Sequence, residues 1–128
     1  MADTEKITIN LSAVDLGRID LLVEEGFYSN RTDFIRTAIR KELESQGAVV
    51  ENGVRRRASI LGLALYTRST LEKCLRDKRM LDINVIGAVN LSDDITPELA
   101  RSTIQSMKVY GVLRAPQALK DALADRIG

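Results

Sequence analysis

The chain has 128 residues, of which 45% are hydrophobic, 29% charged and 4% aromatic. This composition is typical of a folded, water-soluble protein with an aliphatic core, and the length suits one domain or two very small ones. A formal net charge of +1 argues, taken alone, against a nucleic-acid-binding protein. The chain has no His and a single cysteine, Cys74, which excludes a disulfide framework and makes a transition-metal site or a metal cofactor unexpected.

The charges are unevenly distributed along the chain. Residues 1–45 carry nine acidic and six basic side chains, residues 46–80 three acidic and eight basic, and residues 81–128 six acidic and five basic. The basic middle segment would suit a path along DNA phosphates, with Arg55, Arg56 and Arg57 as accessory phosphate contacts. A solvated basic surface explains the same run of charge equally well.

Residues 6–11 alternate between polar and apolar side chains. A period of two places Lys6, Thr8 and Asn10 on one face of a strand and the apolar residues between them on the other. β-Branched Ile and Thr favour the same extended conformation. The pattern therefore predicts an amphipathic β-strand.

Two helices are predicted directly after this strand. Ser12 starts the first, with an acidic residue three positions later, and Gly26 ends it. Ser29 is the predicted N-cap of the second helix, which has Asp33 in its opening turn and runs for about 15 residues. Both helices carry apolar residues at helical spacing, so each presents one apolar face.

A strand followed by two short helices cannot be a complete fold. A single strand leaves its backbone groups unpaired, and a piece near 45 residues buries too little surface by itself. Two copies resolve both problems, because their strands can pair antiparallel while four helices cover the apolar face of the ribbon. The polar faces of both strands then point outward together, related by a two-fold axis.

The exposed face of such a ribbon suits the reading of base edges in the major groove. Lys6 can donate to guanine, Asn10 can pair with adenine, and Thr8 offers a hydroxyl and a methyl group. The start of the second helix, at Ser29, Asn30 and Arg31, has free backbone N–H groups that can hold a phosphate. An amphipathic edge strand and a simple helix cap are the structural alternatives for these two segments.

Residues 6 to about 44 resemble the ribbon-helix-helix family of bacterial and phage repressors, of the CopG, MetJ and Arc type. The resemblance lies in Lys-Ile-Thr-Ile-Asn-Leu-Ser, a helix ending in Glu-Glu-Gly, and Ser-Asn-Arg-Thr-Asp-Phe-Ile-Arg-Thr-Ala-Ile-Arg. It implies a homodimer with an intermolecular antiparallel ribbon. The family's base-reading positions fall on Lys6, Thr8 and Asn10, and its phosphate clamp falls on Ser29–Arg31. The net acidic charge of this segment departs from what a DNA-binding surface would favour.

The rest of the chain contains a connector and an internal repeat. Residues 46–58 are predicted to be a connector, in which Asn52-Gly53 forms either a tight hairpin or a plain loop. Three apolar segments, 60–64, 85–89 and 109–113, then share a glycine at their third position, 25 and 24 residues apart. Predicted helices follow them at about Ser69–Met80, Thr96–Met107 and Pro116–Ile127.

These strand-helix units favour parallel strands stacked side by side, either in a short solenoid or in an ordinary small α/β domain. The predicted fold class is therefore α+β, with a ribbon-helix-helix dimer followed by a small α/β domain of strand-helix repeats. The predicted divisions are residues 1–45 for DNA binding and dimerisation, 46–58 for the connector, and 59–128 for oligomerisation or sensing. Cys74 is expected to be a small buried hydrophobe.

The sequence predicts a sequence-specific transcriptional regulator, most simply a repressor, acting as a homodimer, tetramer or higher oligomer. Its partners would be double-stranded DNA with palindromic or repeated half-sites, other copies of itself, and a protein bound through residues 59–128. An antitoxin that represses its own operon and a DNA-coating or partitioning protein are the alternatives. No arrangement typical of an enzyme is found. No signal segment or long apolar run occurs, so a cytoplasmic, nucleoid-associated protein without membrane contact is expected.

Overall fold

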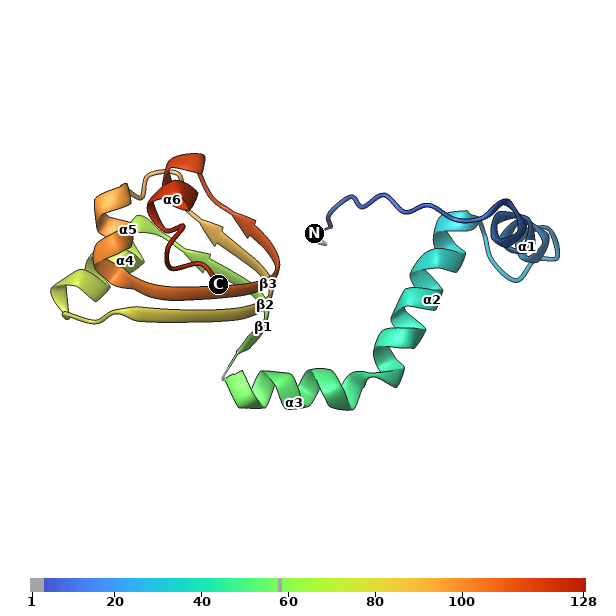
Figure 1. Ribbon diagram of the computed structural model, residues 1–128, viewed down its shortest axis with the longest axis horizontal. Helices are drawn as coiled ribbons and strands as arrows, with labels where there is room; N and C mark the ends of the chain where they lie inside the picture. Colours follow the sequence, from blue (N-terminus) through green and yellow to red (C-terminus); the bar gives the residue numbers. More distant parts are fainter. Residues whose placement is uncertain (1–3, 58) are drawn as a thin grey trace. The chain divides into compact units, whose positions relative to one another are not determined.

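The computed structural model describes residues 4–57 and 59–128. The chain divides into two compact units, Met1–Gly47 and Ala48–Gly128 (Figure 1). Within the described ranges, helices and parallel strands follow one another, and none of these helices is long and apolar enough to cross a membrane. The elements are α1 (Ala13–Glu24), α2 (Arg31–Ser45), α3 (Gly47–Arg57), β1 (Ile60–Tyr66), α4 (Arg68–Arg76), β2 (Leu81–Leu91), α5 (Pro97–Thr103), β3 (Ile104–Arg114) and α6 (Gln117–Ala122).

Helix α1 begins and ends as its sequence predicts. The Ser12 hydroxyl accepts a hydrogen bond from the backbone N–H of Asp15 at 3.1 Å, which satisfies one of the free donors of the first turn. At the other end Gly26 adopts φ +88°, a conformation that glycine reaches without a steric penalty. The Ser12 cap and the Gly26 stop are both confirmed.

Helix α2 has the predicted length of 15 residues, but its N-cap is Asn30 and not Ser29. The Asn30 side chain accepts from the backbone N–H of Asp33 at 2.8 Å. The Asp33 carboxylate in turn accepts from the backbone N–H of Ser29 at 2.9 Å, so the N-cap lies one residue later than predicted. Asn30 and Ser29 are comparable caps, and the Asp33 carboxylate selects between them.

Residues 4–12 carry no regular secondary structure and precede α1 as an extended trace (Figure 1). A β-strand is defined by hydrogen bonds to a neighbouring strand, and the N-terminal unit of a single chain offers this segment none within its described residues. The strand expected at residues 6–11 is therefore not formed within one chain. An intermolecular ribbon would supply its missing neighbour.

The hairpin or loop predicted within residues 46–58 is not formed, because residues 47–57 form helix α3. The Asn52-Gly53 pair neither turns a hairpin nor forms a loop, and Gly53 is buried in the helix. Glu51 and Arg55 form an ion pair at 2.6 Å across one turn, with the acid on the N-terminal side. Three arginines in the last turn also complement the partial negative charge of the helix C-terminus.

The second unit contains a three-stranded parallel sheet in the chain order β1-β2-β3. Helices α4, α5 and α6 lie together against one face, with α5 between the other two (Figure 1). One continuous core joins the sheet to all three helices, with Leu71 of α4, Ala100 of α5 and Leu119 of α6 almost completely buried. The expected parallel stack of three strand-helix units is observed. Cys74 is buried as well, at 2% exposure.

The three repeated glycines lie side by side across the sheet. Gly62 pairs with Gly87, and Gly87 pairs with Gly111. All three have strongly positive φ values, of +134°, +141° and +126°. A methyl group at Gly87 would lie 2.0 Å from the carbonyl oxygen of Gly62, and one at Gly111 would lie 2.0 Å from that of Gly87. Backbone contact therefore requires glycine at the second and third positions.

All three predicted helices of this unit are longer than the observed ones. The first ends at Arg76, after which Lys78 takes a positive φ of +54°. The second ends at Thr103, and β3 begins at the next residue, so residues 104–107 are strand and not helix. The third ends at Ala122, and Ile127 forms an isolated bridge with Met107 of β3. The Thr96 N-cap and the proline at the first helical position are confirmed.

We predict that Gly87→Ala destabilises the second unit more than Gly62→Ala. Alanine at Gly62 meets only the backbone penalty of a positive φ, about 1–3 kcal/mol, because no described atom lies within 4 Å of the added carbon. At Gly87 the same penalty is joined by overlap with the Gly62 carbonyl oxygen. Urea unfolding of the two variants followed by circular dichroism measures the difference, and equal losses of stability would contradict the stacked geometry.

Candidate nucleic-acid interface

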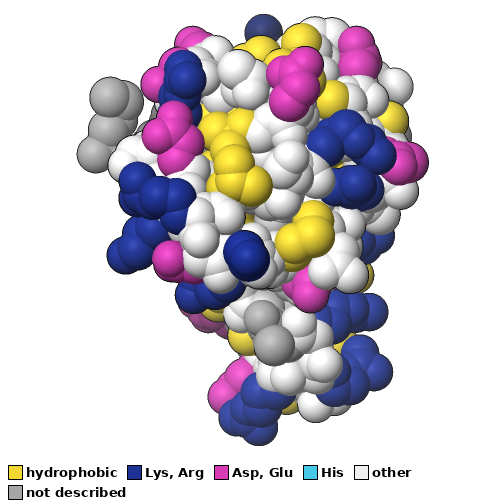
Figure 2. Space-filling model, turned by 90° about the vertical axis from the view of Figure 1, so that its left-hand side faces the viewer, with side chains coloured by type: hydrophobic (Ala, Val, Ile, Leu, Met, Phe, Trp, Pro, Cys, Tyr) yellow, Lys and Arg dark blue, Asp and Glu magenta, His cyan; other side chains and the backbone are white. Residues whose placement is uncertain are grey.

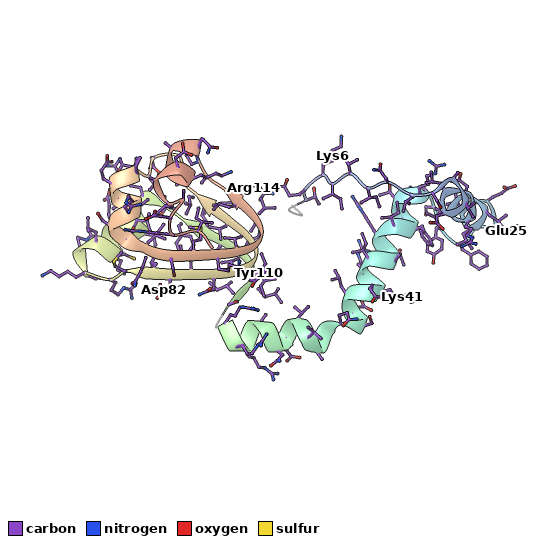
Figure 3. All side chains as sticks on the ribbon, in the orientation of Figure 1. Lys6, Glu25, Lys41, Asp82, Tyr110 and Arg114 are labelled. Atoms are coloured by element: carbon purple, nitrogen blue, oxygen red, sulfur yellow. The ribbon has the colours of Figure 1, made fainter. Side chains whose placement is uncertain are left out.

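The predicted base-reading side chains lie along the extended N-terminal segment. Lys6, Thr8 and Asn10 are all exposed, and Figure 3 shows Lys6 on this trace before α1. The apolar residues between them are also exposed, with 73% of Ile7, 53% of Ile9 and 39% of Leu11 accessible. The single chain thus leaves both faces of the segment open, one polar and one apolar.

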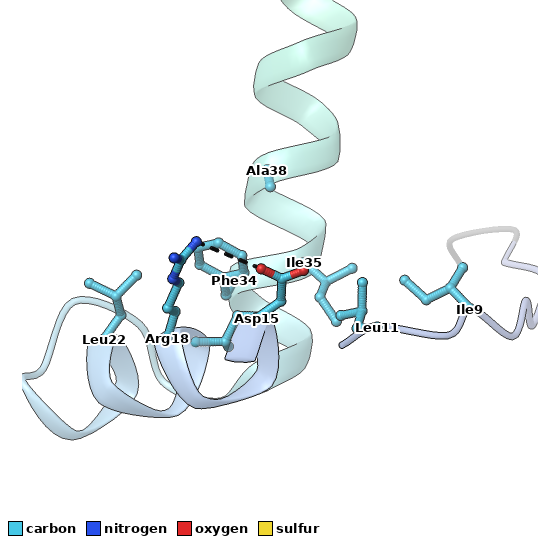
Figure 4. Close-up of a pocket in the computed structure, with 9 residues that line it drawn as sticks. Ile9, Leu11, Asp15, Arg18, Leu22, Phe34, Ile35 and Ala38 are labelled. Atoms are coloured by element: carbon cyan, nitrogen blue, oxygen red, sulfur yellow. Dashed lines mark ion pairs between the residues drawn. The ribbon is translucent and has the colours of Figure 1, made fainter. Parts of the chain in front are cut away.

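An apolar cavity of about 300 Å³ lies between this segment and the two helices of the unit (Figure 4). Ile9 and Leu11 form one side of it, and the apolar residues of α1 and α2 form the rest. Asp15 and Arg18 are its polar members, and they are joined by an ion pair at 3.8 Å. The lining residues are Ile9, Leu11, Asp15, Arg18, Ile19, Leu22, Phe34, Ile35 and Ala38.

The N-terminal unit buries very little. Ile19 is the one buried hydrophobic residue among its described side chains, and α2 has none. At the turn between the helices the Tyr28 and Phe34 rings meet edge to face at 5.0 Å, and Asp20 forms an ion pair with Arg31. An aliphatic surface of this extent is typical of a unit whose core is completed by another chain.

The predicted phosphate clamp surrounds the first turn of α2. Ser29 and Asn30 line a mainly polar cavity of about 340 Å³ at this turn, together with Thr32, Asp33, Arg36 and Arg40. Backbone N–H groups of a helix N-terminus and nearby guanidinium groups are both suited to a phosphate oxygen. Asp33 already caps the turn, so an approaching phosphate would meet one carboxylate beside two cations.

Arg31 lies differently from the other members of the predicted clamp. Its guanidinium donates from Nε and Nη2 to both carboxylate oxygens of Asp20 on α1, each at 2.8 Å. These hydrogen bonds hold the pKa of Asp20 below its usual value and raise the pKa of Arg31. The bidentate pair fixes α1 against the start of α2.

Arg36 and Arg40 are candidate phosphate contacts that the sequence pattern alone did not indicate. They lie three and seven residues after Asp33, a spacing that places all three on one face of α2. Both are exposed and line the cavity beside the predicted clamp. Their helical spacing from Ser29 and Asp33 was the available signal, and it becomes clear once the helix start is known.

The three arginines expected to be accessory phosphate contacts lie in the last turn of α3. Arg55 is paired with Glu51, and the Arg57 guanidinium lies over the Tyr110 ring at 5.4 Å from its centroid. Arg56 is exposed. On the face shown in Figure 2, Lys and Arg side chains lie among Asp and Glu side chains over most of the surface. Basic side chains are therefore interspersed with acidic ones there.

The described residues contain no group of three or more His, Cys, Asp or Glu side chains that could hold a metal ion. The candidate interface combines an exposed polar row, an apolar row behind it, and a capped helix start flanked by arginines.

Comparison with curated proteins and with solved structures finds no match. A family model described as the ribbon-helix-helix transcriptional regulator family matches residues 2–120. This match covers most of the chain, including the second unit as far as α6, and it agrees with the resemblance found in residues 6–44. The chain therefore belongs to the ribbon-helix-helix family of DNA-binding transcriptional regulators.

Proposed function

We propose that this protein is a homodimeric repressor that reads the major groove of DNA with a two-stranded ribbon. The ribbon consists of residues 6–11 from two copies, paired antiparallel. The observation that carries the proposal is the exposed apolar row Ile7, Ile9 and Leu11 beside an apolar cavity, in a unit that buries almost nothing by itself. A second copy is the simplest partner, because the strand of each copy then supplies the neighbouring strand that the other lacks.

The free energy available from this burial is comparable with the cost of forming a dimer. Complete burial of a fully exposed Ile or Leu side chain contributes about 1.5–3 kcal/mol, so the partly exposed rows of two copies contribute roughly 5–10 kcal/mol. Association itself costs about 4–15 kcal/mol in restricted motion. The residual apolar surface of α1 and α2 adds to the favourable side, including Val14, Leu21, Ile39 and Leu43, all of which are exposed in one chain.

Lys6, Thr8 and Asn10 then provide base recognition. Pairing the apolar sides inward directs these three polar side chains outward from both strands, six in total for one dimer. A two-stranded ribbon fits the major groove, where Lys can donate to guanine and Asn can pair with adenine. The two-fold axis favours palindromic half-sites. A dimer seated there would exclude other proteins from the same groove, and this favours repression.

The clamp consists of Ser29 and Asn30 at the start of α2 with the cations Arg31, Arg36 and Arg40, and a phosphate would compete with the Asp33 carboxylate for the Ser29 backbone N–H. These contacts would set the position of the ribbon without reading sequence. Arg56 at the end of α3 remains an accessory phosphate contact in this proposal, whereas Arg55 and Arg57 already have partners within the chain.

A segment that becomes ordered only on a toxin would not need its own core. Residues 59–128 instead share one continuous core between a parallel sheet and three helices. This observation favours a regulator with a folded second unit over an antitoxin.

We predict that alanine at Lys6, Thr8 or Asn10 weakens sequence preference and leaves the dimer intact. Removal of each base-reading side chain should reduce discrimination by about 1–3 kcal/mol, because the three side chains are exposed and support no packing. Gel shifts against the protein's own upstream DNA and against scrambled DNA measure the preference, and sedimentation measures the dimer. Wild-type preference in all three variants would contradict the ribbon assignment.

The apolar row gives the matched control for that experiment. Ile9→Lys introduces a charge on the opposite face of the same segment, where it would be buried in the ribbon. We expect this variant to lose both the dimer and DNA binding. A stable Ile9→Lys dimer would show that the segment is not at the subunit interface.

We predict that Arg36→Ala and Arg31→Ala weaken binding to all DNA sequences alike. The dependence of log affinity on log salt should flatten by about 0.9 for each phosphate that is no longer neutralised, hence by about 1.8 for a dimer. Affinity measured over a series of salt concentrations gives this slope. Asp20→Ala is the control for Arg31, because it breaks the same ion pair but keeps the cation. If Asp20→Ala flattens the slope equally, Arg31 acts only by holding α1 against α2.

A further inference from the structure

The glycine stack across the sheet has one member without a neighbour. Gly87 and Gly111 each need glycine because the carbonyl oxygen of the preceding strand's glycine occupies the space of a side chain. Gly62 has the same backbone conformation, with φ +134°, yet no atom of the described chain lies within 4 Å of its missing side chain. At Gly62, the space that a neighbouring glycine carbonyl fills at Gly87 and Gly111 is therefore empty within the described chain.

Strand β1 is also an unprotected edge. Its outward side chains Leu61, Leu63 and Leu65 are between 61% and 67% exposed, and the strand contains no charged residue. Exposed edge strands in proteins normally carry charge, a proline or a covering segment, because a bare apolar edge pairs with other strands. A bare apolar edge of this kind is open to pairing with another β-strand.

The opposite edge of the sheet has the complementary group. Strand β3 is the last in the stack, and no further strand follows it in the described part of the chain to receive the Gly111 carbonyl. Residues 126–128 cover only the beginning of this edge, through backbone hydrogen bonds from Met107 to Arg126 at 2.9 Å and from Gly128 to Met107 at 2.8 Å. The remainder of β3, from Val109, follows this covered part.

Strand β1 is about as long as the part of β3 that the C-terminal residues leave uncovered. Strand β1 has seven residues, whereas β2 and β3 have eleven. Through β2, its first residue Ile60 is level with Val109, which lies just beyond the covered Met107. A β1 strand placed against β3 in the register of the existing sheet would therefore start just after the C-terminal segment ends. It would also place Gly62 beside Gly111.

We propose that β3 of one copy pairs in parallel with β1 of another copy, head to tail, through the second unit. The Gly111 carbonyl then occupies the open space at Gly62, and the glycine stack continues from copy to copy. Extending the observed register brings Leu61 beside Tyr110 and Leu63 beside Val112. Tyr110 is 40% exposed and lies level with Leu61 in this register.

This assembly goes beyond DNA binding by the dimer, and its edge contact forms without DNA. A head-to-tail contact leaves one free edge at each end, so it produces a ring or an open chain and not a closed pair. Dimers joined in this way would bind cooperatively to repeated half-sites.

The test uses the full chain without DNA and places opposite charges on the two edges. Leu61→Lys and Tyr110→Glu each set a charge against an apolar neighbour, and each should weaken association beyond the dimer by about tenfold or more. An equimolar mixture of the two variants should recover this association. The β1 edges that carry Leu61→Lys then meet β3 edges that carry Tyr110→Glu, and the two unmodified edges meet each other. Sedimentation velocity over a range of concentrations measures all three samples and the wild type.

Val49→Lys is the control, since Val49 is 69% exposed on α3 and belongs to neither edge strand. It should assemble like the wild type, and circular dichroism should show every variant folded. A wild type that stays dimeric at all concentrations overturns the proposal. So does a Tyr110→Glu variant that assembles normally, which would indicate symmetric pairing of two β1 strands, or a mixture that fails to recover.

Discussion

The apolar side of residues 7–11 is the constraint on which the N-terminal half depends. Ile7 and Ile9 remain more than half exposed although an apolar cavity lies beside the segment. One short segment cannot both satisfy its backbone and close this cavity, because a strand needs a neighbour of similar length. The local features of the unit are complete without a partner: two capped helices, a bidentate ion pair and an aromatic contact. Its core is what remains incomplete.

Much of this half could be predicted from the sequence because its signals are local. The Ser12 cap, the Gly26 stop and the 15-residue second helix each depend on a few neighbouring residues. The N-cap at Asn30 could not be chosen over Ser29, since both are good caps and the choice rests on the Asp33 carboxylate. The clamp cavity with Arg36 and Arg40 required the helix start to be known first.

The errors in the second half arise where one pattern has two structural meanings. Ile104 and Met107 continue the helical spacing of α5, yet they are buried core residues of β3, because the strand starts without an intervening turn. Asn52-Gly53 between valines is typical of a hairpin, but the Glu51–Arg55 pair and the terminal arginines stabilise a helix there. The glycine spacing, by contrast, carried over directly into the register of the sheet, because it reflects contact between backbones and not a local preference.

The two units leave strand edges unpaired in different ways, and symmetry decides what each can build. A ribbon of two identical antiparallel segments uses both of its inner edges on one another, so that assembly stops at two. Within the described residues the parallel sheet has two dissimilar ends, an open glycine position on β1 and, on β3, a glycine beyond which no further strand lies. Two dissimilar edges can pair only head to tail, so each added copy leaves one edge of each kind for the next. A chain that carries one edge of each kind therefore has the means both to limit a DNA-reading unit to a dimer and to join such dimers in a row.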